Sequence, residues 1–215
     1  QLLETFQRYG KWLTRLGIEN VGALNNAIDE DRGQEIVLVS EALHEQYIAD
    51  IARQIAAKRN ELRLILISGP SSSGKTTFSR RLTVQLLALG ISPFPLEMDN
   101  YFVNRDQNPR DENGEFDFET IEALDLKRLA EDLQKMTSGK RVQMPHYNFK
   151  TGQSEPGEEV QLRNGQLIIL EGIHGMNPRL IPFDLQSQAF RIYISALTQL
   201  NLDRHNRVST TDTRL

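Results

Sequence analysis

The 215-residue sequence contains no cysteine. Disulfide bridges, cysteine-ligated zinc, iron–sulfur clusters and a thiol nucleophile are therefore excluded for this chain. Long hydrophobic runs are also missing, and no apolar stretch approaches the ~20 residues of a membrane-spanning helix. The N-terminus lacks a signal-peptide pattern, because Glu4, Arg8 and Lys11 lie within its first turns. We therefore expect a cytoplasmic protein with no membrane partner.

The sequence also lacks an excess of positive charge. Its 25 lysines and arginines are outnumbered by 29 aspartates and glutamates, which gives a net charge of -4. A mildly acidic chain is not typical of proteins that coat nucleic acid, so we predict no nucleic-acid partner. Hydrophobic residues make up 39% and charged residues 25% of the chain, as in folded globular proteins and unlike disordered ones.

The first 60 residues carry helical patterns. Apolar residues recur at spacings of three and four over Gln1–Gly17 and again over Gln34–Arg59, which predicts a helix in each range. The second helix is long and amphipathic, and it either packs on a core or contacts a partner or a neighbouring domain. We assign residues 1–60 to an N-terminal helical segment that ends a preceding region.

Short apolar runs alternate with helical patterns over residues 61–215. Leu62–Ser68, Leu167–Glu171 and Phe190–Ser195 read as buried strands, and the prolines of Pro93–Met98 confine a further strand to an end or an edge. Strands that alternate with helices predict an α/β fold with a doubly wound parallel sheet.

Several connecting segments have their own signals. Tyr101–Glu119 is a long polar loop, and loops of this length are more often functional than filler. Asp125 can cap a helix over Leu126–Met136, and Gln143–Phe149 is extended. Asn164-Gly165 is typical of a hairpin turn.

The strongest chemical signal is the run Gly69-Pro70-Ser71-Ser72-Ser73-Gly74-Lys75-Thr76, which matches G-x-x-x-x-G-K-[ST]. It follows an apolar strand and precedes an amphipathic helix, as a phosphate-binding loop does. The glycines let backbone N–H groups face phosphate oxygens, and the helix N-terminus favours negative charge. In this motif Lys75 reaches the β- and γ-phosphates and Thr76 ligates Mg²⁺. The nucleotide would therefore be bound by Gly69, Ser71, Ser72, Ser73, Gly74, Lys75, Thr76 and Thr77.

Two carboxylates follow predicted strands. Asp99 lies just past the strand that ends near Met98, where it either takes a proton from a substrate hydroxyl or caps the local turn. Glu171 closes a buried strand, where it either helps to hold Mg²⁺ or is simply solvated. In a parallel sheet both would lie beside the phosphate-binding loop.

Other polar and aromatic residues carry weaker signals. The aromatic pair in Met144–Phe149 either stacks on a ligand ring or packs a hairpin. His174 has no partner at ligand spacing, so we expect a hydrogen bond within its loop rather than a metal. Arg204, Arg207 and Arg214 either face solvent or stabilise charge near a phosphate.

An ordered set of motifs resembles the uridine kinase/phosphoribulokinase family, from about Leu64 to the last residue. The motifs are Gly69–Phe78, Met98–Phe102, Phe116-Asp117, Tyr147–Phe149, Glu171–Gly175 and Thr210–Leu215. The resemblance implies a nucleoside-kinase-like P-loop fold with a five-stranded parallel core. It also implies ATP and Mg²⁺ as cofactors, a hydroxyl-bearing small molecule as acceptor, and Glu171 as the acid of the magnesium site.

The same resemblance implies roles for residues on the acceptor side. Asp99 matches the general base, and Asp117 matches a carboxylate that hydrogen-bonds ribose hydroxyls. Tyr147 and Phe149 match the aromatic wall of the acceptor pocket. Arg214 matches an arginine that reaches the acceptor.

The chain departs from the family at Lys150–Gln153, where uridine kinases carry a base-reading histidine. An arginine-bearing lid would follow Leu215, so we expect the kinase domain, residues 61–215, to stop before its lid. The leading hypothesis is an ATP-dependent kinase acting on a nucleoside or ribose-like hydroxyl. The alternative is an ATP-binding regulatory module whose kinase activity has drifted or been lost. The identity of the acceptor stays open, and so does the question of whether the chain forms a homo-oligomer.

Overall fold

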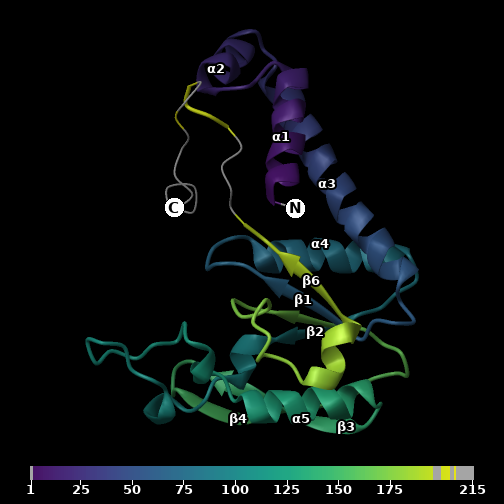
Figure 1. Ribbon diagram of the computed structural model, residues 1–215, viewed down its shortest axis with the longest axis vertical. Coiled ribbons are helices and arrows are strands. Elements are labelled where there is room, and N and C mark those ends of the chain that lie inside the picture. Colours follow the sequence, from purple (N-terminus) through teal and green to yellow (C-terminus); the bar gives the residue numbers. More distant parts are fainter. Residues whose placement is uncertain (1, 196–199, 204–205, 207–215) are drawn as a thin grey trace. The chain divides into compact units, whose positions relative to one another are not determined.

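Three helices form the N-terminal part of the chain (Figure 1): α1 (Leu2–Leu16), α2 (Val21–Asp29) and α3 (Gly33–Ala57). The computed structural model describes residues 2–195, 200–203 and 206. Helices α1 and α3 confirm the two predicted helices, whereas the sequence pattern did not predict α2. The Asn20 side chain begins α2 by accepting a hydrogen bond from the Ala23 N–H at 2.9 Å.

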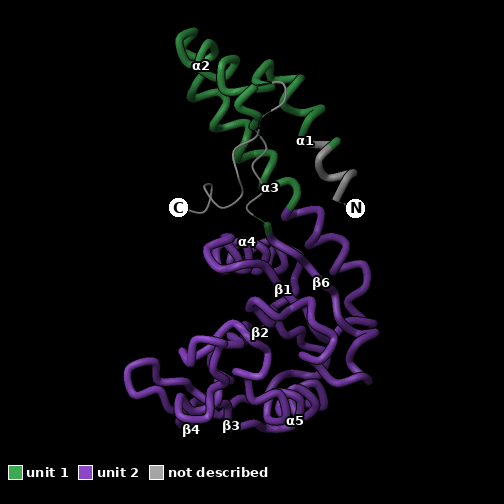
Figure 2. Tube along the Cα trace, turned by 60° about the vertical axis from the view of Figure 1, so that its left-hand side comes forward, with its two compact units in different colours: residues 1–47, 195–215 green, residues 48–194 purple. Residues whose placement is uncertain are grey.

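The chain divides into two compact units (Figure 2). Gln1–Tyr47 and Ser195–Leu215 form the first, and Ile48–Ile194 form the second. The first unit has a small core of four buried apolar residues, Leu13, Ile18, Ala27 and Ile36. The boundary at residue 47 falls within α3, whereas the sequence places it at residue 60, after the same helix.

A parallel sheet forms the centre of the second unit. Its strands lie in the order β2 (Phe94–Glu97), β5 (Ile168–Glu171), β1 (Leu64–Ser68) and β6 (Ala189–Tyr193), and all neighbours run parallel. This order confirms the predicted doubly wound α/β sheet and the edge position of the proline-bearing strand. The described residues contribute four strands to this sheet, against the five that the family resemblance implies.

Helices cover both faces of the sheet, with α4 (Lys75–Ala88) on one side and α5 (Leu126–Thr137) on the other (Figure 1). Side chains of a strand alternate between its two faces. Leu64 and Leu66 of β1 therefore pack in one core with α5, and Ile65 and Ile67 pack in a second core with α4. The sheet is buried on both faces, which explains the uninterrupted apolar runs of its central strands.

A separate antiparallel hairpin consists of β3 (Arg141–Asn148) and β4 (Gln153–Gln161). The hairpin predicted around Asn164-Gly165 is wrong. Gly165 does adopt the left-handed conformation of a tight turn, with φ +74°. However, β4 and β5 on either side of this turn belong to different sheets, because β5 pairs with the parallel strands β1 and β2.

The long segment between β2 and α5 is folded into short 3₁₀ turns. These are η1 (Met98–Tyr101), η2 (Arg105–Gln107) and η3 (Ile121–Ala123). Asp125 caps α5 as predicted, and its carboxylate accepts the Arg128 N–H at 3.0 Å. Among the described residues, no helix combines the length and the apolar character needed to cross a bilayer.

Candidate active site

The turn between β1 and α4 holds the Gly69–Thr76 motif in a tightly curved conformation. Ser72 and Gly74 have φ angles of 57° and 85°. Turns with such left-handed residues typically turn successive N–H groups to the inside of the curve. A Cβ at position 69 would lie 2.2 Å from the Ile194 carbonyl oxygen, so only glycine fits beside the end of β6. The N-terminus of α4 opens directly behind this turn, which makes the turn a site for an anion.

A cavity of about 490 Å³ lies over this turn. The Lys75 ammonium lies within it and donates to the Pro70 carbonyl at 2.8 Å. The Ser73 hydroxyl is buried and has no hydrogen-bond partner among the described residues. A cation, an unpaired hydroxyl and inward N–H groups are the donors that phosphate oxygens accept, so these residues fit a nucleotide phosphate. The cavity is lined by Ser71, Ser72, Ser73, Gly74, Lys75, Thr76, Thr77, Glu97, Asp99, Glu171, Gly172 and Ile173.

Thr76 and Glu171 meet at one edge of this cavity. The Thr76 hydroxyl donates to a Glu171 carboxylate oxygen at 2.5 Å. The sheet brings them together, because β5 pairs with β1 and ends at Glu171 where the phosphate-binding turn begins. One carboxylate and one hydroxyl are oxygen ligands of the kind that hold Mg²⁺ together with substrate phosphates, so the pair fits this ion.

Asp99 lies in η1, immediately after β2 ends. The β2 and β5 strands pair with Glu97 opposite Glu171, so Asp99 comes to the same carboxyl edge of the sheet as the phosphate-binding turn. Burial raises the pKa of the Asp99 carboxyl above its usual range, and the neighbouring Glu97 raises it further. The Lys75 ammonium lowers this pKa in part. A carboxyl with a raised pKa in a cavity is a candidate for proton transfer.

A second, smaller cavity of about 180 Å³ lies next to the first. Asp99, Ser71 and Ile173 line both cavities, so Asp99 stands where the two meet. The rest of the smaller cavity is mainly apolar and is lined by Met98, Phe102, Phe118, Glu119, Leu124 and His174. The Asp99 carboxylate thus lies between a cavity that fits phosphate and a mainly apolar cavity. Such a site can bring a phosphate and a second molecule together.

Aromatic rings cluster around Phe102 beside this smaller cavity. The Phe102 ring centroid lies 5.5 Å from that of Tyr147, 5.8 Å from Phe118 and 6.3 Å from Phe149. The two aromatic residues predicted to form the acceptor wall are in different situations. Tyr147 is 1% exposed within the hairpin, whereas Phe149 is 61% exposed in the turn. Sequence reasoning gave no role to Phe102 or Phe118, although Phe102 belongs to the conspicuous run that contains Asp99.

The structure does not bring Asp117 into the group around Asp99. Its carboxylate accepts the N–H groups of Glu119 and Thr120, at 2.9 and 3.2 Å. Within the part of the chain that the structure describes, Phe118 and Glu119 rather than Asp117 line the smaller cavity. Arg214 lies outside the described residues.

His174 contributes a polar group to the smaller cavity. It hydrogen-bonds the backbone of Thr120, in another loop rather than its own, and burial lowers its pKa. Its Nε2 atom is buried, and no hydrogen-bond partner for it occurs in the part of the chain that the structure describes. Among the described residues, no cluster of three or more His, Asp or Glu side chains could hold a metal.

Arg105 fastens the loop after Phe102 to the turn of the hairpin. Its guanidinium donates to the Phe149 carbonyl at 2.7 Å, and its N–H donates to the Gly152 carbonyl at 2.8 Å. The neighbouring Asn104 side chain accepts the Ser154 N–H at 2.9 Å. The turn that carries Phe149 is thus held against the loop that carries Phe102.

Replacing Gly152 with alanine is expected to destabilise this region. Gly152 has φ +73°, and a Cβ there would lie 2.7–2.8 Å from Arg105 atoms. Gly165 has a similar φ of +74° but open space around it, so Gly165→Ala is the matched control. We expect Gly165→Ala to lower the free energy of unfolding by roughly 1–2 kcal/mol for backbone strain alone. Gly152→Ala should cost about 1–3 kcal/mol more, the usual effect of overpacking. Urea denaturation measures both, and equal losses would contradict the Arg105 contact.

Known proteins share the motifs and the fold of this site. A model of the Phosphoribulokinase / Uridine kinase family matches residues 64–207. Uridine kinase of Schizosaccharomyces pombe is 35% identical over 118 residues, which cover 54% of this chain and 25% of that protein. Inorganic pyrophosphatase TTM1 of Arabidopsis thaliana is 29% identical over 158 residues, 71% of this chain and 23% of that protein.

A solved structure gives the same match at the level of the fold. The structure of a possible uridine kinase from Bacillus stearothermophilus superimposes with a TM-score of 0.55 and 26% sequence identity. The match covers 71% of this chain and 80% of that one. In contrast, the chain spans about a quarter of the length of the two curated relatives above.

Proposed function

The chain belongs to the phosphoribulokinase/uridine kinase family, and on this premise we propose that it transfers the γ-phosphoryl group of ATP to a hydroxyl of a nucleoside or ribose-like acceptor. The position of Asp99 carries the proposal. A carboxylate that lines both the phosphate-binding cavity and the adjoining cavity stands where the donor phosphate and the acceptor hydroxyl must meet.

The phosphate-binding turn holds the donor. Its N–H groups and the Lys75 ammonium bind the phosphates and offset the charge that spreads over the transferred group. Thr76 and Glu171 supply oxygen ligands for Mg²⁺, which when bound neutralises charge on the β- and γ-phosphates. Positioning and charge stabilisation account for most of the catalysis of phosphoryl transfer, so the chemistry needs few other groups here.

The acceptor occupies the smaller cavity. Its hydroxyl lies against the Asp99 carboxylate, which removes the proton as the oxygen attacks phosphorus. The rings of Phe102 and Phe118 form apolar walls, and exposed Phe149 extends them. Asp117, Tyr147 and Arg214 keep the acceptor-side roles implied by the family resemblance as proposals. For Asp117 such a role falls to Oδ2, because Oδ1 already accepts the Glu119 and Thr120 N–H groups.

An acceptor screen tests the proposal. Purified chain is incubated with ATP and Mg²⁺, and ADP release is followed with uridine, cytidine, ribose and other hydroxyl compounds added one at a time. We expect ADP release that depends on a nucleoside or a ribose-like sugar and that Asp99→Asn lowers by roughly 10²–10⁴-fold. Tight ATP binding without acceptor-dependent release would overturn the proposal.

That opposite result would instead support an ATP-binding regulatory module. One observation favours this second function. The turn at Lys150–Gln153, where uridine kinases carry a base-reading histidine, contains none. In this case ATP would bind in the larger cavity, and no acceptor would raise the rate of ADP formation.

The pH dependence of turnover should report the raised pKa of Asp99. A general base must be ionised, so kcat/KM falls as the pH drops through this pKa. Burial and Glu97 raise the pKa of Asp99. We therefore expect the acid limb of the pH profile, where kcat/KM falls with falling pH, to lie above the ordinary pKa range of carboxyl groups. Glu97→Gln removes one of these causes and should move the limb to lower pH, while Glu61→Gln, in an exposed turn, should not. An acid limb unmoved by Glu97→Gln would contradict the assignment.

A further inference from the structure

A buried polar pair lies behind the turn that carries Asp99. Tyr101, the last residue of η1, is 1% exposed, and its hydroxyl donates to an Asp132 carboxylate oxygen at 3.2 Å. Asp132 belongs to α5 and is 5% exposed. Both groups lie among the apolar residues that pack α5 against the sheet, and burial raises the pKa of each.

Apolar side chains could fill this part of the core as well as Tyr101 and Asp132 do. A phenylalanine would fill almost the same volume as Tyr101, and a leucine would suit the site of Asp132. Burying a carboxyl is costly, and well-packed apolar side chains often replace buried polar pairs without loss of stability. The hydrogen bond has a preferred direction, which packing lacks, so it fixes the position of the Tyr101 ring along α5.

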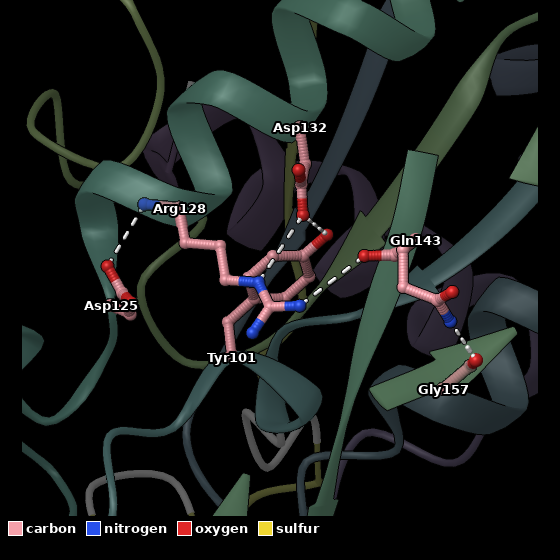
Figure 3. Close-up of polar contacts among 6 residues, drawn as sticks. All are labelled: Tyr101, Asp125, Arg128, Asp132, Gln143 and Gly157. Carbon is pink, nitrogen blue, oxygen red and sulfur yellow. Dashed lines mark hydrogen bonds and ion pairs between the residues drawn. The ribbon is translucent and has the colours of Figure 1, made fainter. Parts of the chain in front are cut away.

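The pair belongs to a chain of contacts across several elements (Figure 3). Arg128 lies one helical turn before Asp132, with its Nε 3.9 Å from the carboxylate. The Nη2 atom of Arg128 donates to the Gln143 carbonyl of β3 at 3.4 Å, and the Gln143 side chain donates to the Gly157 carbonyl of β4. The Tyr101 hydroxyl is therefore tied through α5 to the hairpin that carries Tyr147.

Within the part of the chain that the structure describes, three further hydrogen bonds involve the η1 turn. Its closing hydrogen bond, from the Phe102 N–H to the Asp99 carbonyl, is long at 3.4 Å. The bond from the Tyr147 N–H to the Asn100 side chain is also 3.4 Å. The Asp125 N–H donates to the Tyr101 carbonyl at 2.8 Å. The shortest of these three bonds comes from Asp125, the residue that caps α5, so α5 and its cap hold the end of the turn that follows Asp99.

We propose that the contact between Tyr101 and Asp132 positions Asp99 for proton transfer. The proposal rests on the function proposed above, in which Asp99 is the base. Tyr101 and Asp132 are positioning residues that line neither described cavity, so their loss should lower kcat and leave KM for ATP nearly unchanged. Misplacing a catalytic group by about 1 Å can cost up to about 100-fold in rate, so we expect a loss of about 10- to 100-fold.

Tyr101→Phe is the central variant, assayed with uridine or whichever screened acceptor supports turnover. Hydrogen–deuterium exchange of residues 98–102 is measured in parallel, and faster exchange is expected because the turn loses its anchor. Met136→Val removes apolar volume from the same core and leaves the polar pair intact. It should lower stability without lowering kcat.

Two substitutions of Asp132 separate positioning from general destabilisation. Asp132→Asn keeps an oxygen that accepts from Tyr101, so it should retain most of the turnover. Asp132→Leu has no acceptor and should lose as much as Tyr101→Phe. The double variant Tyr101→Phe/Asp132→Leu should lose no more than either single variant, because both remove the same contact.

Several results would overturn the proposal: unchanged exchange at residues 98–102 in Tyr101→Phe, unchanged kcat in that variant, or equal losses in Asp132→Asn and Asp132→Leu. If the unsubstituted chain releases no ADP with any acceptor, the proposed function fails instead. Exchange at residues 98–102 then decides the positioning by itself, faster exchange in Tyr101→Phe supporting it and equal exchange overturning it.

Discussion

Replacing Asp99 with asparagine is expected to lower turnover by roughly 10²–10⁴-fold, the usual contribution of a general base. Asparagine has the same size and keeps a hydrogen-bonding side chain, but it cannot take a proton at neutral pH. ATP affinity should change little, because the phosphate-binding turn and Lys75 remain. The effect should therefore appear in kcat, with KM for ATP nearly unaltered.

The measurement combines acceptor-dependent ADP release with the dissociation constant of ATP from calorimetry. Asp106→Asn is the matched control, since Asp106 is an exposed aspartate in η2 and lines neither described cavity. Turnover that survives Asp99→Asn would remove Asp99 from the role of base. Loss of ATP binding in the same variant would place Asp99 in donor binding instead.

The phosphate-binding turn could be predicted from sequence because its information is local. Eight consecutive residues, a strand before them and a helix after them specify the conformation, and the left-handed φ of Gly74 follows from the motif itself. The positions of Asp99 and Glu171 needed only one further step. Glu171 closes one strand of a parallel sheet and Asp99 follows the end of its neighbour, and the carboxyl ends of such strands share one edge.

The acceptor side could not be predicted in the same way. Tyr147 and Phe149 are two residues apart, and a continuous strand would give them the same exposure. Strand β3 ends at Asn148, however, so Phe149 falls in the turn and becomes exposed while Tyr147 stays buried. The strand ends where the Asn148 side chain accepts the Lys150 and Thr151 N–H groups. Arg105, from a loop far earlier in the chain, then holds this turn in place, and the sequence pattern gives no sign of that contact.

The residues that line the smaller cavity come from loops far apart in the sequence. Phe102, Phe118 and His174 meet there although no spacing connects them. The Asn164-Gly165 turn shows the complementary error. Its local chemistry was read correctly as a turn, but the pairing of β5 depends on the whole sheet, so a hairpin did not follow.

Replacing Lys75 with methionine should weaken donor binding as well as turnover. Methionine keeps most of the length of the side chain but has no charge and no donor. Loss of a hydrogen bond to a charged phosphate should weaken ATP binding by about 10- to 100-fold. Loss of charge stabilisation in the transition state should lower kcat by about 10²–10³-fold, as for the loss of one donor aimed at developing charge.

Lys75→Met should also change the pH profile in a way that simple loss of binding would not. The Lys75 ammonium lowers the pKa of Asp99, so its removal leaves this pKa higher. The residual kcat/KM should therefore begin to fall at a higher pH than in the unsubstituted chain, opposite to the shift expected for Glu97→Gln. Lys140→Met, at an exposed position after α5, is the control. An acid limb that stays in place in Lys75→Met would mean that the ammonium and the Asp99 carboxyl do not act on each other, and the shared site proposed for them would be wrong.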